Sequence, residues 1–334
     1  MTRTFVAVDG GGSKTDVVVG DETGRVLACH RGPGSSPHSL GLDAAVNLLD
    51  SLVREALAVA DLSMADRAEL YLAGADLPIE VDALMSAVSE LGWAGEHRVD
   101  NDLFALLRAG TADPNAIAVV CGSGINCVGC RADGKVARFL ALGGVSGDWG
   151  GGRHLANLML WHAARAEDGR GPATLLSGVV ADHFRRPAVA DVSIGLHLGE
   201  IDHTELDSLA PKLFDAASAG DPVARRVVNR QASEIVAMAT VAADRLGLLD
   251  SDFAVVLGGG VLRARQPMLM DEVTAGMLAA APKARISVAD DLPVAGAALL
   301  ALEAFGTITP AVEERIRGAV GDARQHTAFG THDR

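Results

Sequence analysis

A glycine-rich turn between two apolar runs near the start of the chain limits what this chain can fold into. The runs FVAVD at 5–9 and TDVVV at 15–19 flank the segment GGGSK at 10–14. Short runs rich in β-branched residues on either side of a glycine turn are typical of a β-hairpin. Glycines let a backbone approach a ligand closely, and successive N–H groups in such a turn form a concave anion-binding surface. The segment therefore predicts a hairpin that binds phosphate.

The side chains of this hairpin also suit phosphate. The residues expected to contact it are Gly11, Gly12, Ser13, Lys14 and Thr15. Asp9, at the end of the first strand, is expected to hold a metal ion through water. Dinucleotide-binding and Walker A loops run instead from a strand into a helix, and a glycine precedes the Walker A lysine. Here Ser13 precedes Lys14. The alternative for this segment alone is a glycine-rich hairpin turn without a ligand.

A second segment repeats the pattern of strand, glycine turn and strand, in residues 116–129 (AIAVVCGSGINCVG). Each hairpin is followed by a polar glycine turn, a basic residue and a valine, as DETGRV at 21–26 and as RADGKV at 131–136. Similar units in two halves indicate a duplicated fold with two phosphate-binding hairpins. The second set of residues expected at the phosphates is Gly122, Ser123 and Gly124.

A third glycine loop follows an apolar run in residues 255–262 (VVLGGGVL). The residues expected to pass close to a flat ligand such as adenine or ribose are Gly258, Gly259 and Gly260. The alternative is a strand-to-helix turn without a ligand.

Together these loops resemble the superfamily of sugar kinases and actin-like ATPases. Within it, the chain is similar to the family that N-acetylglucosamine kinases share with the activator ATPases of benzoyl-CoA reductase, the BadF/BadG/BcrA/BcrD family. The resemblance extends from Phe5 to about Ala304. It rests on the order and spacing of five motifs, which are DGGGSKTD at 9–16, ND at 101–102, CGSGINC at 121–127, SGDWGGG at 146–152 and LGGG at 257–260.

The resemblance implies an α/β fold of two actin-like (ribonuclease H-like) domains, with mixed β-sheets flanked by helices and an active-site cleft between them. It implies ATP and Mg²⁺ as cofactors, and a kinase that phosphorylates the 6-hydroxyl of N-acetylglucosamine to give N-acetylglucosamine 6-phosphate. Relatives are commonly dimers, so a homodimer is expected.

Two carboxylates compete for the role of general base in such a reaction. Asp100 and Asp102 both lie where a predicted strand gives way to a helix, a place where side chains project into a ligand crevice. A purely structural role for Asp102 is to cap the helix that begins near Leu103. The resemblance favours Asp102 as the catalytic base, because the family's catalytic aspartate opens that helix, and it places Asn101 at the substrate.

A second carboxylate is expected to bind the sugar. Asp148 lies in a glycine turn, where it can accept hydrogen bonds from two neighbouring hydroxyls; an Asx-turn is the structural alternative. The resemblance assigns Gly147 and Asp148 to the sugar-binding motif. It also assigns Asn126, beside the second phosphate loop, to the sugar.

The sequence departs from the family pattern in two places. Ser36 and His38, with Pro37 between them, occupy a loop in which relatives often have an asparagine that contacts the sugar. They are expected at the substrate. Trp149 follows Asp148 where eukaryotic members have glutamate. Both departures concern how the 2-amino or 2-acetamido group is recognised, so glucosamine kinase is the close alternative.

Two further alternatives belong to other functional classes. An activator ATPase would need exposed cysteines that bridge an iron–sulfur cluster between subunits. The cysteines near the second hairpin, Cys121, Cys127 and Cys130, are expected to lie in strands. A non-catalytic scaffold or sugar sensor would not need Asp102 and Asp148.

Composition excludes some partners. The formal net charge of −14 argues against a surface for nucleic acid or for an anionic membrane, since either needs a basic patch. No signal peptide or membrane-spanning run is apparent. Four cysteines in 334 residues indicate a reducing cytoplasm. Cys127 and Cys130 have zinc-site CxxC spacing, but their positions on opposite faces of a strand favour small packed residues.

Strands alternate with helices after the opening meander, which is typical of an α/β domain with a mixed sheet. The polar segment TADPN at 111–115 is the natural linker. We therefore expect one domain at 1–112, a second at 113–324 and a disordered tail at 325–334. Residues 191–208 show no regular pattern.

Overall fold

The structure, a computed structural model, describes residues 2–306 and 308–325 and divides them into two compact units. Unit 1 contains the chain up to Pro114 together with the segment from Ala289 onward, and unit 2 contains Asn115–Val288. The expected second domain, 113–324, therefore differs from unit 2, because its last segment belongs to unit 1. The tail expected at 325–334 lies outside the described residues except for Gln325.

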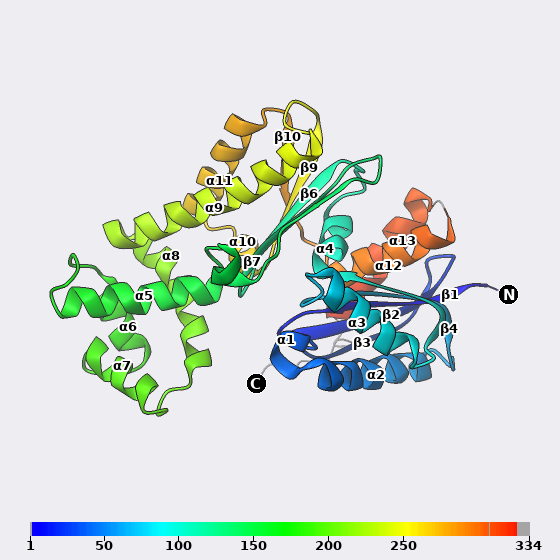
Figure 1. Cartoon of the computed structure of the whole chain (residues 1–334), viewed down its shortest axis with the longest axis horizontal. Coiled ribbons are helices and arrows are strands. Elements are labelled where there is room, and N and C mark those ends of the chain that lie inside the picture. Colours follow the sequence, from blue (N-terminus) through cyan, green and yellow to red (C-terminus); the bar gives the residue numbers. More distant parts are fainter. Residues whose placement is uncertain (1, 307, 326–334) are drawn as a thin grey trace. The chain divides into compact units, whose positions relative to one another are not determined.

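Unit 1 is built on a five-stranded sheet in the order β3-β2-β1-β4-β5 (Figure 1). Its strands are β1 (Thr4–Gly10), β2 (Lys14–Asp21), β3 (Val26–Pro33), β4 (Ala65–Leu72) and β5 (Ala94–Asn101). The first three strands pair antiparallel as a meander, and β4 and β5 add in parallel to β1. The sheet is mixed, as predicted.

Unit 2 repeats this topology, with strand order β10-β9-β6-β7-β8. Its strands are β6 (Ala116–Cys121), β7 (Ile125–Cys130), β8 (Val136–Arg138), β9 (Phe253–Gly258) and β10 (Ala284–Val288). Again the first three strands form an antiparallel meander, and the last two run parallel to the first. The duplication predicted from the two glycine hairpins is confirmed at the level of the whole sheet.

Helices cover both faces of the unit 1 sheet. They are α1 (Pro37–Leu40), α2 (Leu42–Val59), α3 (Pro78–Ser89), α4 (Asp102–Gly110), α12 (Pro293–Phe305) and α13 (Pro310–Gln325). Val6 and Val8 of β1 pack with the apolar stripe of α2. Strand alternation turns Phe5 and Ala7, which are fully buried, to the other face, where α12 contacts the sheet.

The two helices that follow the last strand of each sheet, α4 and α12, pack on one another in unit 1. Gly296 makes this approach possible, because a methyl group there would overlap the Ala105 carbonyl oxygen. The segment after β10 thus returns to unit 1 through a helix-to-helix contact. Periodicity alone does not reveal such a contact.

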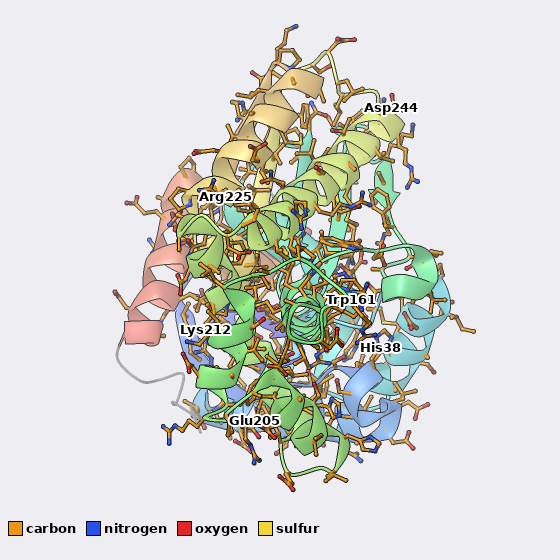
Figure 2. The ribbon with its side chains drawn as sticks, turned by 90° about the vertical axis from the view of Figure 1, so that its left-hand side faces the viewer. His38, Trp161, Glu205, Lys212, Arg225 and Asp244 are labelled. Carbon is orange, nitrogen blue, oxygen red and sulfur yellow. The ribbon has the colours of Figure 1, made fainter. Side chains whose placement is uncertain are left out.

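Unit 2 carries the larger helical layer. Its helices are η1 (Gly143–Ser146), α5 (Gly152–Glu167), α6 (Leu176–His183), α7 (Val189–His197), η2 (His203–Leu209), α8 (Ala210–Ser218), α9 (Pro222–Leu246), α10 (Gly260–Arg263) and α11 (Pro267–Ala280). Figure 2 shows α9 running from Arg225, near its start, to Asp244, near its end. Residues 191–208, which show no regular sequence pattern, contain most of α7 and of η2. No helix in the described part of the chain is long and apolar enough to cross a membrane.

Candidate active site

The first hairpin has a braced turn with an exposed tip. The Gly11 N–H donates to the Lys14 carbonyl at 2.9 Å, which closes the turn. Gly34 passes directly behind it, and a Cβ at Gly34 would lie 2.5 Å from the carbonyl carbon of Gly12. Only glycine fits so close to another backbone. Gly12 and Ser13, both predicted phosphate contacts, are exposed at the tip.

Charged side chains flank this turn. Asp16 is fully buried, and it accepts hydrogen bonds from Lys14 Nζ at 2.8 Å and from Arg31 Nε at 2.5 Å. The lysine predicted to bind phosphate is therefore held by a carboxylate while its side chain stays 42% exposed. Thr15 is buried, and its hydroxyl donates to Ser35 Oγ at 2.8 Å. This bond ties the hairpin to the segment that follows β3.

Asp9 is the predicted metal ligand, and it is 8% exposed at the end of β1. Burial raises its pKa to about 8, and the negative charges of Asp16 and Asp102 add to the effect. A concentration of carboxylates in a buried place is what a divalent cation would neutralise, and oxygen ligands are those that Mg²⁺ prefers. The donor set at Asp9 therefore fits the predicted magnesium ion.

The N-cap of α4 bears on the two roles weighed for Asp102 at the start of this helix. Asn101 is the N-cap, because its side-chain oxygen accepts the Leu103 N–H at 3.0 Å. Asp102 is the first residue of the helix, and its carboxylate also accepts backbone N–H groups at this helix start. Its role as the general base stays a prediction.

The surroundings of Asp102 suit a proton acceptor. Burial, and after it the charge of Asp76, raise the pKa of Asp102 to about 7, against the lowering effect of the backbone N–H groups of Leu103 and Asp102. A general base works best with a pKa near the operating pH. Asp100, the competing carboxylate, is engaged differently: it accepts the Asn101 N–H at 2.8 Å and pairs with Arg98 at 3.3 Å.

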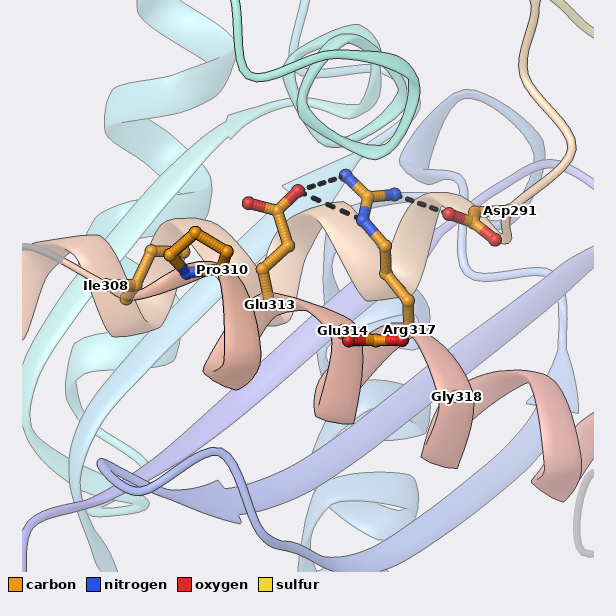
Figure 3. Close-up of a pocket in the computed structure, with 7 residues that line it drawn as sticks. All are labelled: Asp291, Ile308, Pro310, Glu313, Glu314, Arg317 and Gly318. Carbon is orange, nitrogen blue, oxygen red and sulfur yellow. Dashed lines mark hydrogen bonds and ion pairs between the residues drawn. The ribbon is translucent and has the colours of Figure 1, made fainter.

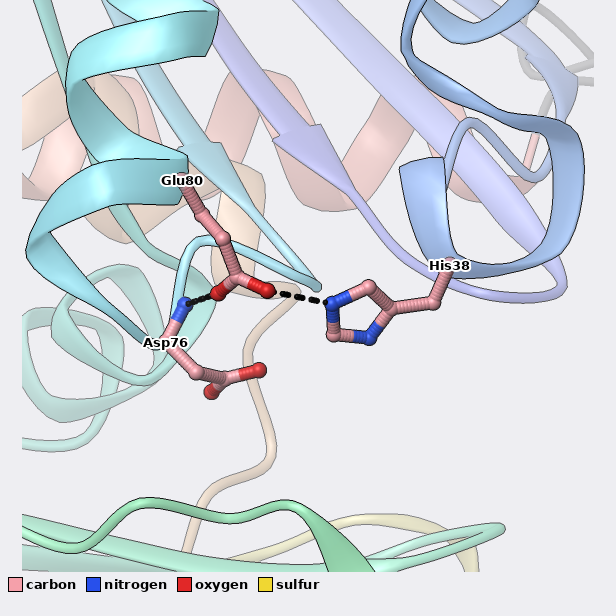
Figure 4. Close-up of side chains that lie close together, drawn as sticks. All are labelled: His38, Asp76 and Glu80. Atoms are coloured by element: carbon pink, nitrogen blue, oxygen red, sulfur yellow. Dashed lines mark hydrogen bonds and ion pairs between the residues drawn. The ribbon is translucent and has the colours of Figure 1, made fainter.

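Sequence reasoning missed one carboxylate beside this base. Asp76, in the loop after β4, accepts a hydrogen bond from Asn101 Nδ2 at 2.9 Å. It also lies in a cluster with His38 and Glu80, whose ligand atoms are all within 4.8 Å of one another (Figure 4). His38 Nε2 is 2.8 Å from Glu80 Oε1. The signal was present, because Asp76 follows a strand parallel to β1, and such strand ends meet at one edge.

Ser36 and His38 lie at the same end of unit 1. Ser36 is buried and precedes α1, and His38 lies within that short helix. Through Asp76, the structure brings His38 close to Asn101 and to the start of α4. These predicted substrate residues therefore gather around one edge of the sheet, together with Asp102.

The second hairpin has a turn one residue shorter, also closed by a backbone hydrogen bond, and no charged side chain at this turn. The Gly122 N–H donates to the Gly124 carbonyl at 2.9 Å, and Ser123 and Gly124 are exposed. Cys121 and Cys127 are fully buried in the core behind it, and burial raises the pKa of Cys121 to about 12. Both cysteines pack as predicted.

The predicted sugar loop lies beside this hairpin. Asp148 Oδ2 accepts hydrogen bonds from the Gly143 N–H at 3.0 Å and from Ser146 Oγ at 2.6 Å, so part of its carboxylate closes its own loop. Gly147 has a φ of +85°, which favours glycine. A cavity of about 280 Å³ is lined by Ser123, Gly124 and Asp148, among others. The cavity thus brings together the second glycine turn and the carboxylate expected to bind sugar. Asn126 is the second residue of β7, and its Oδ1 accepts the Cys127 N–H at 2.7 Å.

The third glycine loop is a strand-to-helix turn in its local structure. Gly258 ends β9 and Gly260 begins α10. Gly259 has a φ of +84°, and a Cβ there would lie 2.5 Å from the carbonyl carbon of Cys121. Close packing on the second hairpin therefore explains Gly259, and the contact of this loop with adenosine stays a prediction.

Known proteins are similar to this chain along most of its length. The family model described as "BadF/BadG/BcrA/BcrD ATPase family" matches residues 6–301. The chain belongs to the BadF/BadG/BcrA/BcrD ATPase family. Family membership confirms the resemblance seen in the motifs and implies the use of ATP.

Two kinases are similar to this chain along most of its length. An N-acetyl-D-glucosamine kinase from Dictyostelium discoideum is 29% identical over 311 residues, which is 89% of this chain and 97% of the relative. An N-acetylmuramic acid/N-acetylglucosamine kinase from Clostridium acetobutylicum is 26% identical over 263 residues, covering 78% and 86%. These relatives support a kinase as the enzyme class.

Solved structures confirm the fold. A protein from Chromobacterium violaceum, assigned as an N-acetylglucosamine kinase, superposes with a TM-score of 0.70 at 22% identity and covers 89% of this chain and 98% of its own. A ROK family glucokinase from Streptomyces griseus, solved with glucose and AMPPNP, superposes with a TM-score of 0.55 at 18% identity, covering 89% and 98%. The α/β fold expected from the motifs is the fold of these sugar kinases.

A larger cavity of about 560 Å³ in unit 1 lies apart from the family motifs (Figure 3). Its lining includes Asp291, Glu313 and Arg317, which form ion pairs with one another. Arg317 also donates to the Arg108 carbonyl at 3.3 Å, at the carboxyl end of α4. These side chains join α13 to α4, so we interpret the cavity as a gap in a structural ion-pair network.

Proposed function

We propose that this protein is an ATP-dependent kinase that phosphorylates the 6-hydroxyl of N-acetylglucosamine, giving N-acetylglucosamine 6-phosphate. The observation that carries the proposal is Asp102, which opens α4 next to the N-cap Asn101 and has a pKa raised to about 7. A carboxylate with these properties suits a general base for a sugar hydroxyl.

The proposed step is an in-line displacement. The 6-oxygen of the sugar forms a bond to the γ-phosphorus of ATP as the bond from that phosphorus to the bridging oxygen of ADP breaks. Asp102 takes the hydroxyl proton. Mg²⁺ at Asp9, when bound, would neutralise charge on the phosphate oxygens. Phosphoryl transfer depends chiefly on positioning and on charge neutralisation, so the hairpins and the sugar loop serve to hold the reactants.

The second unit supplies the proposed positioning groups. Ser123 and Gly124 would hold phosphate oxygens through hydroxyl and backbone donors, and Asp148 would accept hydrogen bonds from neighbouring sugar hydroxyls. The shared cavity supports this assignment, because it brings the phosphate turn and the carboxylate together. The first hairpin, with Gly12, Ser13 and Lys14, is proposed to hold the remaining phosphates.

The direct test is sugar-dependent release of ADP by the purified protein with Mg²⁺-ATP. We expect release with N-acetylglucosamine and none without an acceptor sugar. Phosphorus and carbon NMR of the product then identify the phosphorylated position. Release that does not depend on sugar would overturn the proposal in favour of an ATPase, and a product phosphorylated elsewhere than C6 would overturn its site of attack.

Glucosamine is the second candidate substrate, and the cluster at His38 favours it. Glu80 and Asp76 place two carboxylates beside the imidazole of His38. His38 itself lies in the loop where relatives often have asparagine. A negative environment there would attract the 2-ammonium group of a free amino sugar. Glu80 Oε2 accepts the Asp76 and Leu77 N–H groups at 3.1 and 2.9 Å, which holds the cluster in place.

The two candidates are separated by comparing kcat/KM for both sugars in the wild type and in Glu80→Gln. The amide keeps an oxygen for the backbone N–H groups and removes the charge. If glucosamine binds at this cluster, the variant loses activity on glucosamine selectively. Glu55→Gln is a matched control, because Glu55 forms a similar pair with His30 at 3.0 Å in the same unit. Equal loss for both sugars would reject the cluster as the amino-group site.

We also propose that the protein is a cytoplasmic homodimer. The dimer is proposed because relatives are commonly dimers, and the cytoplasm because the cysteine content indicates a reducing compartment. Light scattering at several protein concentrations tests the dimer.

A further inference from the structure

A fully buried glutamine lies in the middle of α9. Gln231 is 0% exposed, and the other buried residues of that helix are apolar, including Val228, Ala232 and Ile235. Burying an amide is unfavourable unless it forms hydrogen bonds. Hydrophobic packing therefore does not account for glutamine at this position, and its contacts must be considered.

The amide of Gln231 contacts the glycines that follow Asp148. Its Oε1 accepts the Gly151 N–H at 3.0 Å. Gly150 passes so close that a Cβ there would lie 2.6 Å from Gln231 Nε2, and Gly150 has a φ of +127°. Nε2 itself has no partner among the described residues. The glutamine thus holds this backbone on one side.

The second phosphate hairpin holds the same backbone on the other side. A Cβ at Gly151 would lie 2.5 Å from Gly124 Cα, so the two backbones are in direct contact. The Gly152 N–H donates to the Gly122 carbonyl at 2.7 Å, and the Arg153 N–H donates to the Ser123 carbonyl at 3.1 Å. No flexible side chain separates the two loops here.

We propose that Gln231 is a positioning residue that fixes the sugar loop against the second phosphate hairpin. The inference rests on the proposed kinase function. Asp148 stands two residues before Gly150, so a shift of the glycine segment moves the carboxylate relative to Ser123 and Gly124. In a reaction that depends on positioning, displacements of about 1 Å can lower the rate on the order of 100-fold. Gln231 touches neither reactant in this scheme and acts through the loop.

The test uses three variants of the full chain. Gln231→Met keeps the approximate length of the side chain and removes the acceptor for the Gly151 N–H. Gln231→Glu keeps an acceptor oxygen and serves as the conservative variant. Thr240→Val is the matched control, because its hydroxyl is also buried on α9 without a partner among the described residues. Each variant is measured for kcat and KM and for amide hydrogen exchange of residues 147–153.

We expect Gln231→Met to lower kcat about 10- to 100-fold and to speed exchange in the loop, with partial recovery of both in Gln231→Glu. Thr240→Val should match the wild type. An active enzyme in which Gln231→Met leaves kcat within about twofold overturns the inference, as does unchanged loop exchange. The inference is also overturned if both variants lower the melting temperature equally and Gln231→Glu does not recover kcat. That result would show a merely structural role for Gln231.

The two proposals fail separately. If the wild type releases no ADP with any amino sugar, the proposed function is wrong. Loop exchange in Gln231→Met still decides whether this glutamine fixes the glycine segment. If the wild type is active, kcat of the variant decides whether that fixation matters for the reaction.

Discussion

The two glycine hairpins occupy the same place in two sheets of the same topology, yet they present different chemistry. In the first, Asp9 pairs with Asp16 one step before the turn. In the second, the pair at the matching position is Val120 with Asn126. The carboxylate expected to hold metal in one hairpin thus corresponds to a valine in the other. The backbone is repeated, while the charges are confined to the first copy.

The difference extends beyond the hairpins. Among the described residues, buried acidic and basic side chains lie mainly in unit 1, including Asp9, Asp16, Glu69 and Arg108. The second hairpin contributes glycines, a serine and backbone donors, supported by close packing. This comparison suggests that unit 1 carries the proton and metal chemistry, and that unit 2 fixes positions. This interpretation can be tested by exchanging or removing side chains that differ between the two units.

The largest effect is expected from Asp102→Asn. The amide keeps the shape of the side chain and cannot accept the hydroxyl proton, so kcat should fall about 10²–10⁴-fold. Binding of sugar and ATP should change little. Steady-state kinetics with calorimetric titration of each ligand measure both quantities.

Asp100→Asn is the control for this prediction. Asp100 belongs to the same strand end and pairs with Arg98, so its loss should affect stability more than turnover. If Asp100→Asn abolishes activity and Asp102→Asn does not, the assignment of the base is wrong, and so is the contrast between the two units.

In unit 2, Asp148→Ala should weaken sugar binding and leave the nucleotide bound. Loss of a hydrogen bond to a charged group costs roughly 1.5–3 kcal/mol, which is about 10- to 150-fold in Kd. Ser146→Ala separates this effect from loop closure, because it removes only the hydroxyl that donates to Asp148 at 2.6 Å. A similar loss of sugar affinity in both variants would mean that Asp148 acts by shaping its loop.

The sequence predicted the repeated sheets because each hairpin combines strand alternation with a glycine turn, and both signals are local. It did not predict that α12 and α13 belong to unit 1. That outcome depends on Gly296 meeting Ala105, a contact between residues far apart in the chain. The sequence made no clear prediction for 191–208, because α7 is short and its amphipathic pattern is weak.

At the candidate site, the motifs predicted which segments to consider, and the structure adds the contacts between them. Asn101 rather than Asp102 caps α4, a distinction that depends on one backbone geometry. Asp76 and Gln231 were missed because neither belongs to a glycine motif. Their neighbours, Asn101 and Gly151, come from other parts of the chain. Local sequence patterns predict where loops lie, whereas contacts between residues of different loops are known only from the folded structure.

Asp9→Val makes the first hairpin resemble the second, and it should stabilise the metal-free protein. Burial raises the pKa of Asp9 to about 8 in the folded protein, whereas its ordinary value is 3.8. Between these two pH values the carboxyl group is protonated in the folded chain and ionised in the unfolded chain. The wild type therefore loses stability as pH rises from about 4 to about 8. Valine has no such titration.

The gain in melting temperature of Asp9→Val, measured with a chelator present, should grow across that pH range, while kinase activity is lost. Asp9→Asn is the control for size and polarity. A gain that does not depend on pH, or a variant less stable than the wild type at pH 8, would contradict the burial of an acid at this position.

The smallest effect is expected at Glu313, in the ion-pair network of unit 1. Hydrogen bonds from Arg108, at 2.8 and 3.0 Å, and then those from Arg317 lower the pKa of Glu313 to about 2. Figure 3 shows the bonds between Glu313 and Arg317. A lowered pKa means that the contribution of Glu313 to stability is present above about pH 4.5 and is lost as pH falls toward about 2. Glu313→Gln should therefore lower the free energy of unfolding by on the order of 1 kcal/mol at pH 7, and this difference from the wild type should shrink on acidification.

Urea unfolding at pH 7, 4.5 and 3 measures this difference, with the exposed Glu314 replaced by glutamine as control. Because the network joins α13 to the end of α4, a difference that stays constant with pH would mean that shape, rather than charge, holds the returning helices to unit 1.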